Sequence, residues 1–290
     1  MSVFVRQHAI PMKFTKDAWA ILNPIEQSIK AKIEKYGTPL KDWNVNIYRG
    51  VLTGCNEAFI IDGAKRAELI AADPKSDEII RPILRGRDIR RYGYDFADLW
   101  LINIECGFTN SHRKGTPPEE FIKNTYPAIY QHFLNVASQP TRGKGLFDRD
   151  DQGDYWWELR SCAYTNDFSK QNIVWSDIAT SPNFSIVDPD TYFNNTCYML
   201  CDAPTYVLSF LNSKLMEWYF KKISTDLGSG SRYFKQFVEL LPIIKLNDKS
   251  IEKQLEQAST SNEKTINEII FKLYDLTPEE ITLVEKSCQQ

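Results

Sequence analysis

The sequence predicts an α+β fold in which a mixed-sheet domain follows an N-terminal connecting helix and precedes a helical C-terminal arm. Short apolar runs typical of strands alternate with helical patterns through the middle of the chain, and amphipathic helical periods fill its end. No internal repeat or low-complexity tract interrupts this order. We therefore expect three segments, over residues 1–40, 41–245 and 246–290.

The first helix is expected to start at Asn23, because asparagine caps helices and Pro24 suits the first helical position. An apolar stripe follows at helical spacing, formed by Ile25, Ile29 and Ile33. Gly37 is predicted to end the helix in the left-handed conformation that glycine adopts readily.

The domain is predicted to begin with two short strands, over residues 45–51 and 58–61, joined by a turn at Thr53-Gly54. The elements expected next are a helix over 64–72, strands over 79–84 and 99–104, a loop over 107–118, a helix over 126–136 and a loop over 137–156. The last of these loops is polar and glycine-rich, and long irregular segments of this kind tend to be functional or disordered.

The second half of the domain is expected to contain strands on both sides of Ser181-Pro182-Asn183 and another strand over residues 195–202. Pro204 is predicted to open a helix whose apolar face reaches Trp218, before a Gly/Ser loop and a short amphipathic piece. The C-terminal arm is expected to be helical from residue 250, with Thr277 and Glu280 forming a capping box on its last helix.

The charge of the chain is unevenly distributed. A net charge of −3, from 35 basic and 38 acidic side chains, argues at first against a nucleic-acid partner. Residues 247–290 hold five lysines and nine acidic residues, however, which leaves a balance of +1 for the rest of the chain. There, the arginine-rich segment (residues 81–91, RPILRGRDIRR) has five arginines against one aspartate. It fits a DNA-binding face, although solvated surface is the commoner cause of a charge cluster.

Missing motifs exclude several classes of protein. No GxxxxGK[ST] loop and no Glu-x-Lys sequence occurs, and the one Asp-x-Lys sequence is interrupted by Pro74. The three histidines have no close partner, and Cys197 and Cys201 lack a second pair at zinc-site spacing, so we expect both cysteines to pack in the core. We predict neither catalytic residues nor a metal site in this chain.

The chain also lacks the sequence features of a secreted or membrane protein. No apolar run approaches the length of a membrane span, and the first residues do not resemble a secretion signal. The six scattered cysteines indicate free thiols in a reducing compartment. We therefore expect a cytoplasmic protein that is not associated with a membrane.

A more specific signal comes from blocks of sequence that follow one another along the chain. The first spans residues 48–95, and the later ones are ELRSCAY (158–164), IVWSDIATSPNFSIVDPDTYFNNTCYML (173–200), LSFLNSKLMEWYF (208–220), RYFKQFVELLPI (232–243) and INEIIFKLYDLTPEEITLVE (266–285). Together they resemble the TaqI-like C-terminal specificity domain of type IIG restriction enzymes and adenine-specific DNA methyltransferases. The resemblance covers nearly the whole chain, and it implies that residues 41–245 are a DNA target-recognition domain.

The resemblance also implies what lies elsewhere. Members of this family carry a methyltransferase domain with an Asn-Pro-Pro-aromatic motif and a site for S-adenosylmethionine, whereas Asn23-Pro24-Ile25-Glu26 is not that motif. We expect no cofactor in this chain, and S-adenosylmethionine in a catalytic domain outside it. The expected partners are double-stranded DNA and a methyltransferase domain, either of the same parent protein or of a separate subunit.

Three other interpretations stay open at this point. The chain could be a specificity subunit like those of type I restriction–modification systems, although it has one recognition unit rather than two. It could be a self-contained nuclease with a site that no motif reveals. It could also be a degenerate fragment without function.

The side chains that we expect to contact DNA are basic or small and polar, because these types bind phosphates and base edges. They are Thr53, Gly54, Asn56, Arg85, Arg87, Arg90, Arg91, Arg142, Lys144, Ser181, Asn183, Ser231, Arg232 and Lys235.

Each group has an alternative explanation. The arginines could pair internally with Asp88, Asp95 or Asp98, and the residues around Gly54 and Pro182 could serve turn formation alone. The loop that contains Arg142 and Lys144 could be merely mobile. For Arg232 and Lys235 we favour contacts with phosphates.

Overall fold

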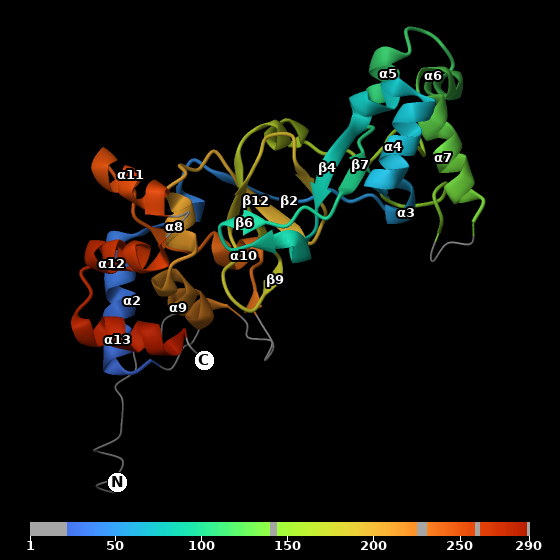
Figure 1. The fold of residues 1–290 in the computed structure, drawn as a ribbon. Coiled ribbons are helices and arrows are strands. Elements are labelled where there is room, and N and C mark those ends of the chain that lie inside the picture. The colour runs from blue at the N-terminus through green and yellow to red at the C-terminus, as the bar shows by residue number, and fades with distance from the viewer. Residues whose placement is uncertain (1–21, 140–143, 225–230, 259–261, 289–290) are drawn as a thin grey trace, which may run out of the picture. The chain divides into compact units, whose positions relative to one another are not determined.

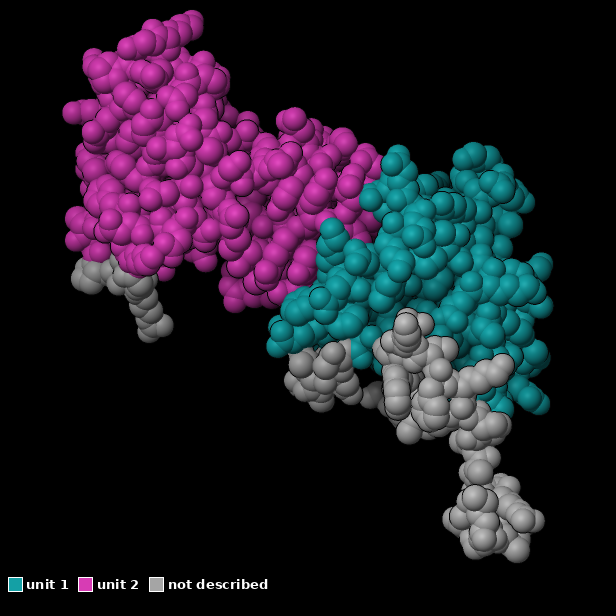
Figure 2. All heavy atoms as spheres, turned by 180° about the vertical axis from the view of Figure 1, so that it is seen from behind, with its two compact units in different colours: residues 1–45, 178–182, 204–290 teal, residues 46–177, 183–203 magenta. Residues whose placement is uncertain are grey.

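The computed structural model describes residues 22–139, 144–224, 231–258 and 262–288, which fall into two compact units (Figures 1 and 2). Unit 1 contains the described residues of 1–45, 178–182 and 204–290, and unit 2 contains those of 46–177 and 183–203. This division differs from the three segments expected from the sequence, because residues 204–245 pack with both ends of the chain.

Unit 1 is mainly helical (Figure 1). Its described elements are α2 (Pro24–Tyr36), β1 (Thr38–Pro39), β9 (Ile178–Ala179), α8 (Val207–Leu211), α9 (Lys214–Ile223), β13 (Ser231–Arg232), α10 (Lys235–Val238), β14 (Pro242–Ile243), α11 (Lys249–Ala258), α12 (Glu263–Leu273) and α13 (Pro278–Ser287). The short strands form two antiparallel pairs among the described residues, β1 with β14 and β9 with β13.

Capping and charge join the first and last helices of unit 1. As expected, Asn23 caps α2, and Thr277 and Glu280 form a capping box on α13. The Glu280 carboxylate also accepts hydrogen bonds from Lys32 Nζ at 2.8 Å and Ser28 Oγ at 2.7 Å, so it links α13 to α2. Helices α11, α12 and α13 confirm the helical C-terminal arm predicted from the sequence.

The end of α2 corrects the role predicted for Gly37. Its φ of −88° and ψ of 156° describe extended backbone rather than the left-handed conformation. A Cβ atom at this position would lie 2.3 Å from the carbonyl oxygen of Pro242. Glycine is therefore required here because the strand β14 approaches closely, a contact distant in sequence.

The helix predicted to run from Pro204 to Trp218 is broken into α8 and α9. The break lies at Asn212-Ser213, where the Ser213 hydroxyl accepts the N–H of Met216 at 3.2 Å and starts a new helix. Serine competes in this way with the helical hydrogen-bond ladder.

Unit 2 combines two sheets with a group of helices. Its described elements are β2 (Asn46–Arg49), α3 (Asn56–Phe59), β3 (Ile60–Asp62), α4 (Gly63–Ala72), β4 (Ile80–Leu84), β5 (Ile89–Arg90), β6 (Gly93–Tyr94), β7 (Leu99–Ile102), α5 (Phe108–His112), α6 (Pro118–Thr125), α7 (Pro127–Ala137), β8 (Asn172–Ser176), β10 (Ser185–Val187), β11 (Tyr192–Phe193) and β12 (Cys197–Cys201).

The two larger sheets of unit 2 explain the mixed-sheet α+β class. One has the order β10-β8-β12-β2 with antiparallel neighbours. The other has the order β11-β4-β7-β3, in which β11 runs parallel to β4 while the remaining pairs are antiparallel. Helices α4 and α7 lie beside this second sheet (Figure 1), where Phe59 and Phe133 pack with ring centroids 5.0 Å apart. The predicted fold class is confirmed.

The strand predicted over residues 58–61 is partly wrong. Ala58 and Phe59 donate their backbone N–H groups to the carbonyl of Cys55 and lie in the short helix α3. The strand β3 that follows pairs with β7 rather than with β2, so no hairpin forms around Gly54. Likewise, the loop predicted over 107–118 contains the helix α5.

The expected burial of two cysteines is confirmed. Cys197 and Cys201 are fully buried on β12, where a four-residue spacing places them on one face of the strand. None of the helices in the described part of the chain combines the length and the apolar character that a membrane span needs.

Candidate nucleic-acid interface

The arginine-rich turn (residues 85–95) is held by an internal ion pair. Arg85 Nε and Nη2 donate to Asp88 Oδ2 and Oδ1, both at 2.8 Å, and the backbone N–H of Arg85 donates to the same carboxylate. This two-point geometry is the strongest form of arginine–carboxylate contact. Of the two roles considered for Arg85, internal pairing is therefore the one that the structure supports.

Burial of Asp88 makes this ion pair a structural element rather than a surface contact. The residue is 5% exposed, and burial alone would raise the pKa of its carboxyl group. The hydrogen bonds from Arg85 outweigh that effect and hold the pKa below its ordinary value. The hydrogen bonds to Asp88 also raise the pKa of Arg85.

Contacts with the neighbouring sheet fix the turn further. The Gly86 N–H donates to Thr196 Oγ1 at 2.8 Å, and the Tyr92 N–H donates to the carbonyl of Phe184 at 3.0 Å. A Cβ atom on Gly86 would lie 2.6 Å from Ser176 Oγ, so only glycine allows this close approach. The backbone of the turn is thus anchored at both ends.

The other arginines of the turn differ in what they contact. Arg87 is exposed, and its guanidinium forms no hydrogen bond or ion pair within the described residues. Arg90 pairs with Asp95 at 2.8 Å and donates to the Arg87 carbonyl at 2.6 Å. Arg91 is half-buried, with its guanidinium carbon 5.8 Å from the ring centre of Tyr92. Arg87 is therefore the cation of this turn that is available to a phosphate or a base.

A second group of predicted residues lies in unit 1, on the β9–β13 ribbon (residues 178–179 and 231–232). Ser231 pairs with Ala179 and is buried, whereas Arg232 pairs with Ile178 and is exposed. Lys235 is exposed at the first position of α10, and Ser181 is exposed beyond the end of β9. Arg232 also lies 5.3 Å from the ring centre of Phe234.

The remaining predicted residues have mainly structural contacts or are not described. Asn183 is half-buried, and its Oδ1 accepts the N–H of Ser176 at 3.3 Å. Lys144 is exposed and pairs with Asp150 at 2.5 Å. Arg142 lies outside the described residues.

Thr53, Gly54 and Asn56 form a turn that depends on a distant arginine. The Thr53 hydroxyl donates to Asn56 Oδ1 at 2.6 Å, and the Thr53 side chain is buried. The Thr53 carbonyl accepts from Arg149 Nε at 3.0 Å, while Gly54 has a φ of +66° and packs against the Arg149 side chain. These contacts favour the turn-forming role for Thr53 and Gly54, and leave Asn56 exposed.

Arg149 itself is a residue that sequence reasoning missed. It is 3% exposed, and its guanidinium donates to five backbone carbonyl oxygens, those of Thr53, Leu146, Asp151, Trp156 and Glu158. Burial lowers its pKa to about 10. The Arg149 loop (residues 144–160) is therefore wrapped around a buried cation, and no local motif in the sequence signals this.

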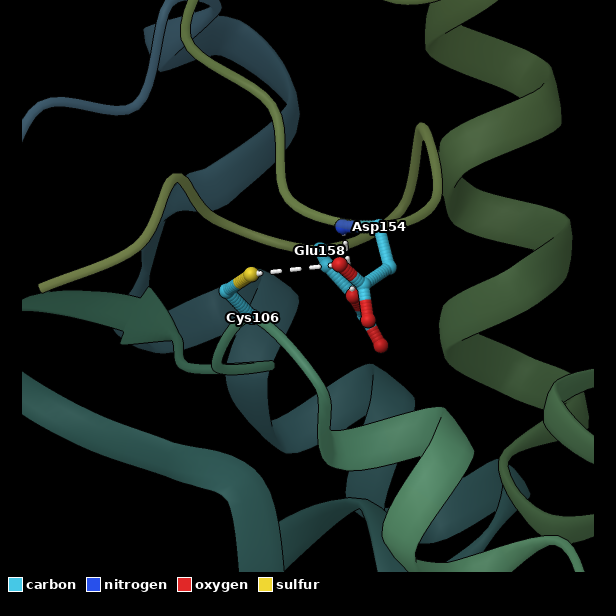
Figure 3. Close-up of side chains that lie close together, drawn as sticks. All are labelled: Cys106, Asp154 and Glu158. Atoms are coloured by element: carbon cyan, nitrogen blue, oxygen red, sulfur yellow. Dashed lines mark hydrogen bonds between the residues drawn. The ribbon is translucent and has the colours of Figure 1, made fainter.

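Asp154 and Glu158 of this loop converge with Cys106, with potential ligand atoms within 4.8 Å of one another (Figure 3). Glu158 accepts backbone N–H groups from Gly107, Thr109 and Asp154 at 2.9–3.1 Å. Asp154 accepts the Cys106 thiol at 3.6 Å and the Asn110 amide at 2.8 Å. Both carboxylates are thus engaged in hydrogen bonds that tie the loop to α5.

A cleft of about 410 Å³ also lies in unit 2, lined by residues 49–52 and 159–166 together with Tyr192. Its two arginines are already matched, because Arg49 pairs with Asp177 at 3.5 Å and Arg160 pairs with Asp151 at 3.0 Å. The cleft is therefore a weaker candidate for anion binding than the exposed cations described above.

Comparison with known proteins gives one sequence match and several similar structures. The family described as the TaqI-like C-terminal specificity domain matches residues 81–243. No curated protein matches the sequence. The type IIL restriction–modification enzyme MmeI, solved in complex with DNA, is similar at a TM-score of 0.59 and 12% identity, over 87% of this chain and 36% of that one. The type IIG restriction endonuclease BpuSI is similar at a TM-score of 0.58 and 13% identity, over 90% of this chain and 31% of that one. The chain thus spans about a third of the length of either enzyme.

Proposed function

The chain belongs to the family of TaqI-like C-terminal specificity domains, and from this premise we propose that it recognises duplex DNA on behalf of a separate catalytic domain. The similarity to MmeI, an enzyme solved in complex with DNA, supports the same role. The net charge of −3 is no obstacle, since the acidic surplus lies in residues 247–290.

The observation that carries the proposal is the exposed guanidinium of Arg87 on a turn that the rest of the structure immobilises. The Arg85–Asp88 ion pair and the bond from Gly86 to Thr196 hold the backbone, so little loop entropy is lost when Arg87 binds. Arginine suits either phosphate or the O6 and N7 atoms of guanine. Arg232 and Lys235 would add phosphate contacts from unit 1.

The catalytic partner is part of this proposal. We propose that a methyltransferase domain, in the same polypeptide or in a separate subunit, binds S-adenosylmethionine and modifies adenine near the site that this chain selects. Incubation of the chain alone with S-adenosylmethionine and mixed-sequence duplex DNA should then transfer no methyl group. Methyl transfer by the chain alone would contradict the assignment of catalysis to a partner.

DNA binding is tested by measuring affinity for a random-sequence duplex pool as a function of salt. Affinity should fall steeply with added salt, because binding releases counterions from the phosphates. Arg87→Ala should weaken binding and, if Arg87 contacts a phosphate, reduce the slope of log affinity against log salt by about one. Lys123→Ala is the matched control, since Lys123 is an exposed cation of α6 outside the predicted interface.

The outcomes separate the possibilities clearly. Equal losses for the Arg87 and Lys123 variants would indicate unspecific attraction and would contradict the assigned role of Arg87. Affinity that does not change between low and physiological salt would contradict DNA binding through these cations altogether.

A further inference from the structure

The β9–β13 ribbon has two different faces. Side chains directly opposite each other on paired strands point to the same side, and successive residues along a strand alternate. Ser231 and Ala179 therefore share one face, which is largely buried. Arg232 and Ile178 share the other face, which is exposed.

Ile178 is an unusual residue for such a position. Its side chain is 53% exposed, more than the other large hydrophobic residues found exposed in the described part of the chain. A single exposed hydrophobic residue is unremarkable in itself. Here, however, the isoleucine stands beside an exposed arginine and is followed by the exposed small polar residues Thr180 and Ser181.

This combination suits the major groove of DNA. A two-stranded ribbon fits that groove in width, and an apolar side chain can contact the C5-methyl group that distinguishes thymine there. The neighbouring cation can hold the ribbon in place through a phosphate. The other exposed isoleucine of unit 1, Ile25 on α2, has no such ribbon around it.

We propose that the β9–β13 ribbon enters the major groove, where Ile178 reads the methyl group of a thymine and Arg232 positions the ribbon on the phosphate backbone. This inference rests on the proposed DNA-binding function and deepens it by naming a residue that determines specificity. Ile178 contributes selectivity between bases, whereas Arg232 contributes affinity that does not depend on sequence.

The test uses the full chain and duplexes that it retains from a random library at low salt. Each thymine of the selected site is replaced in turn by deoxyuridine, which lacks only the C5-methyl group. At one position this replacement should weaken binding of the unaltered chain about threefold to fivefold, as expected for losing one buried methyl-sized group. The Ile178→Ala variant should bind the thymine duplex with that reduced affinity, and the deoxyuridine should cause no further loss.

Two other variants serve as controls. Ile25→Ala should keep both the affinity and the deoxyuridine effect, because it removes an exposed isoleucine outside the ribbon. Arg232→Ala should weaken binding to all duplexes and lower the salt slope by about one, without changing the preferred bases.

The inference fails if no thymine position responds to deoxyuridine, or if Ile178→Ala retains the response. It also fails if Ile178→Ala weakens binding equally at every sequence, since that result indicates general contact or wedging. If the unaltered chain retains no DNA from the library, the proposed function itself fails, which is a distinguishable outcome.

Discussion

Two loops of unit 2 are each organised by an arginine with little exposure, but the charge of that arginine is handled in opposite ways. In the arginine-rich turn, Arg85 meets the carboxylate of Asp88 at two points. In the Arg149 loop, the guanidinium instead donates to five backbone carbonyl oxygens of the described residues. In the first loop, the additional cation Arg87 forms no ion pair within the described residues, whereas the exposed cations of the second loop, Lys144 and Arg160, pair with aspartates.

The difference shows that the contacts of an arginine decide whether it is free to bind a ligand or holds the fold together. Asp88 neutralises the charge of Arg85 inside the turn, whereas the charge of Arg87 stays exposed to solvent. Arg149 uses Nε, Nη1 and Nη2 to hold backbone carbonyl groups, and its side chain is buried, so it is not presented to a ligand. The first arrangement leaves a cation exposed to solvent, and the second stabilises the fold.

The largest effect is expected from Arg149→Met. This substitution leaves five carbonyl acceptors without their donor in a buried place, and we expect a loss of about 3–5 kcal/mol in the free energy of unfolding. Urea denaturation measures the loss. Arg160→Met is the control, because that arginine is exposed and should cost less than about 1 kcal/mol. Similar losses for both variants would contradict the special structural role assigned to Arg149.

Glu158→Gln tests the other anchor of the Arg149 loop. The fully buried carboxylate accepts three backbone N–H groups, and the amide keeps one acceptor oxygen and adds donors with no acceptor. We expect a loss of about 2–3 kcal/mol in unfolding free energy, in the range for hydrogen bonds to charged groups. Increased protease cleavage within residues 144–160 would localise the change. An unaltered denaturation midpoint would show that the carboxylate is not an anchor.

Asp88→Asn tests the ion pair of the arginine-rich turn, and its effect should depend on pH. At neutral pH we expect a loss of about 1–3 kcal/mol, since Arg85 is left without its charged partner. The pKa of Asp88 is lower in the folded state than in the unfolded state, so its stabilisation is present above the unfolded pKa and disappears as pH falls through the folded one. The difference between the two proteins should therefore shrink below about pH 4. A difference independent of pH would point to packing instead.

Arg87→Ala should leave folding unchanged while altering binding. Because the side chain has no hydrogen bond or ion pair within the described ranges, its removal should change the unfolding free energy by less than about 0.5 kcal/mol. The affinity for DNA should nevertheless fall. The Asp88→Asn variant differs, because its main effect should be a loss of stability. A clear drop in the midpoint of denaturation would reveal a structural role and weaken the distinction between Arg85 and Arg87.

The smallest effect is expected for Lys144→Ala. Lys144 and Asp150 form an exposed pair, with side chains 61% and 78% accessible, and such pairs contribute little to stability. The denaturation midpoint should shift hardly at all. A large shift would mean that the exposed Lys144–Asp150 pair stabilises the Arg149 loop in addition to the buried arginine.

The sequence predicted local structure well where residues close to one another in the chain determine it. The caps at Asn23 and Thr277 and the helical period of the arm depend on residues within a few positions of one another. Prediction failed where a distant segment intervened. Gly37 was expected to end the helix in the left-handed conformation, yet glycine is required there by the close approach of Pro242. The two strands expected on either side of the turn at Gly54 do not pair with each other, because β3 pairs with β7.

The candidate site shows the same division. Composition and spacing predicted the arginine-rich segment and the basic residues near residue 232 as candidate surfaces for DNA. They could not say that Arg85 is matched by Asp88 while Arg87 is exposed, because that depends on which side chains the fold buries. Ile178 was not among the expected contacts, since a single apolar residue in a strand gives no sign of which face it occupies.

The sequence by itself therefore determined the fold class and the uneven distribution of charge, which follow from local pattern and composition, and its resemblance to known sequences indicated the family. Tertiary structure alone decided which arginines hold the chain together and which face solvent. The physical reason is that a guanidinium has the same charge everywhere, whereas the cost of burying it depends on the acceptors that distant segments bring to it. Arg149, wrapped by carbonyls from residues 53 to 158, is the clearest example.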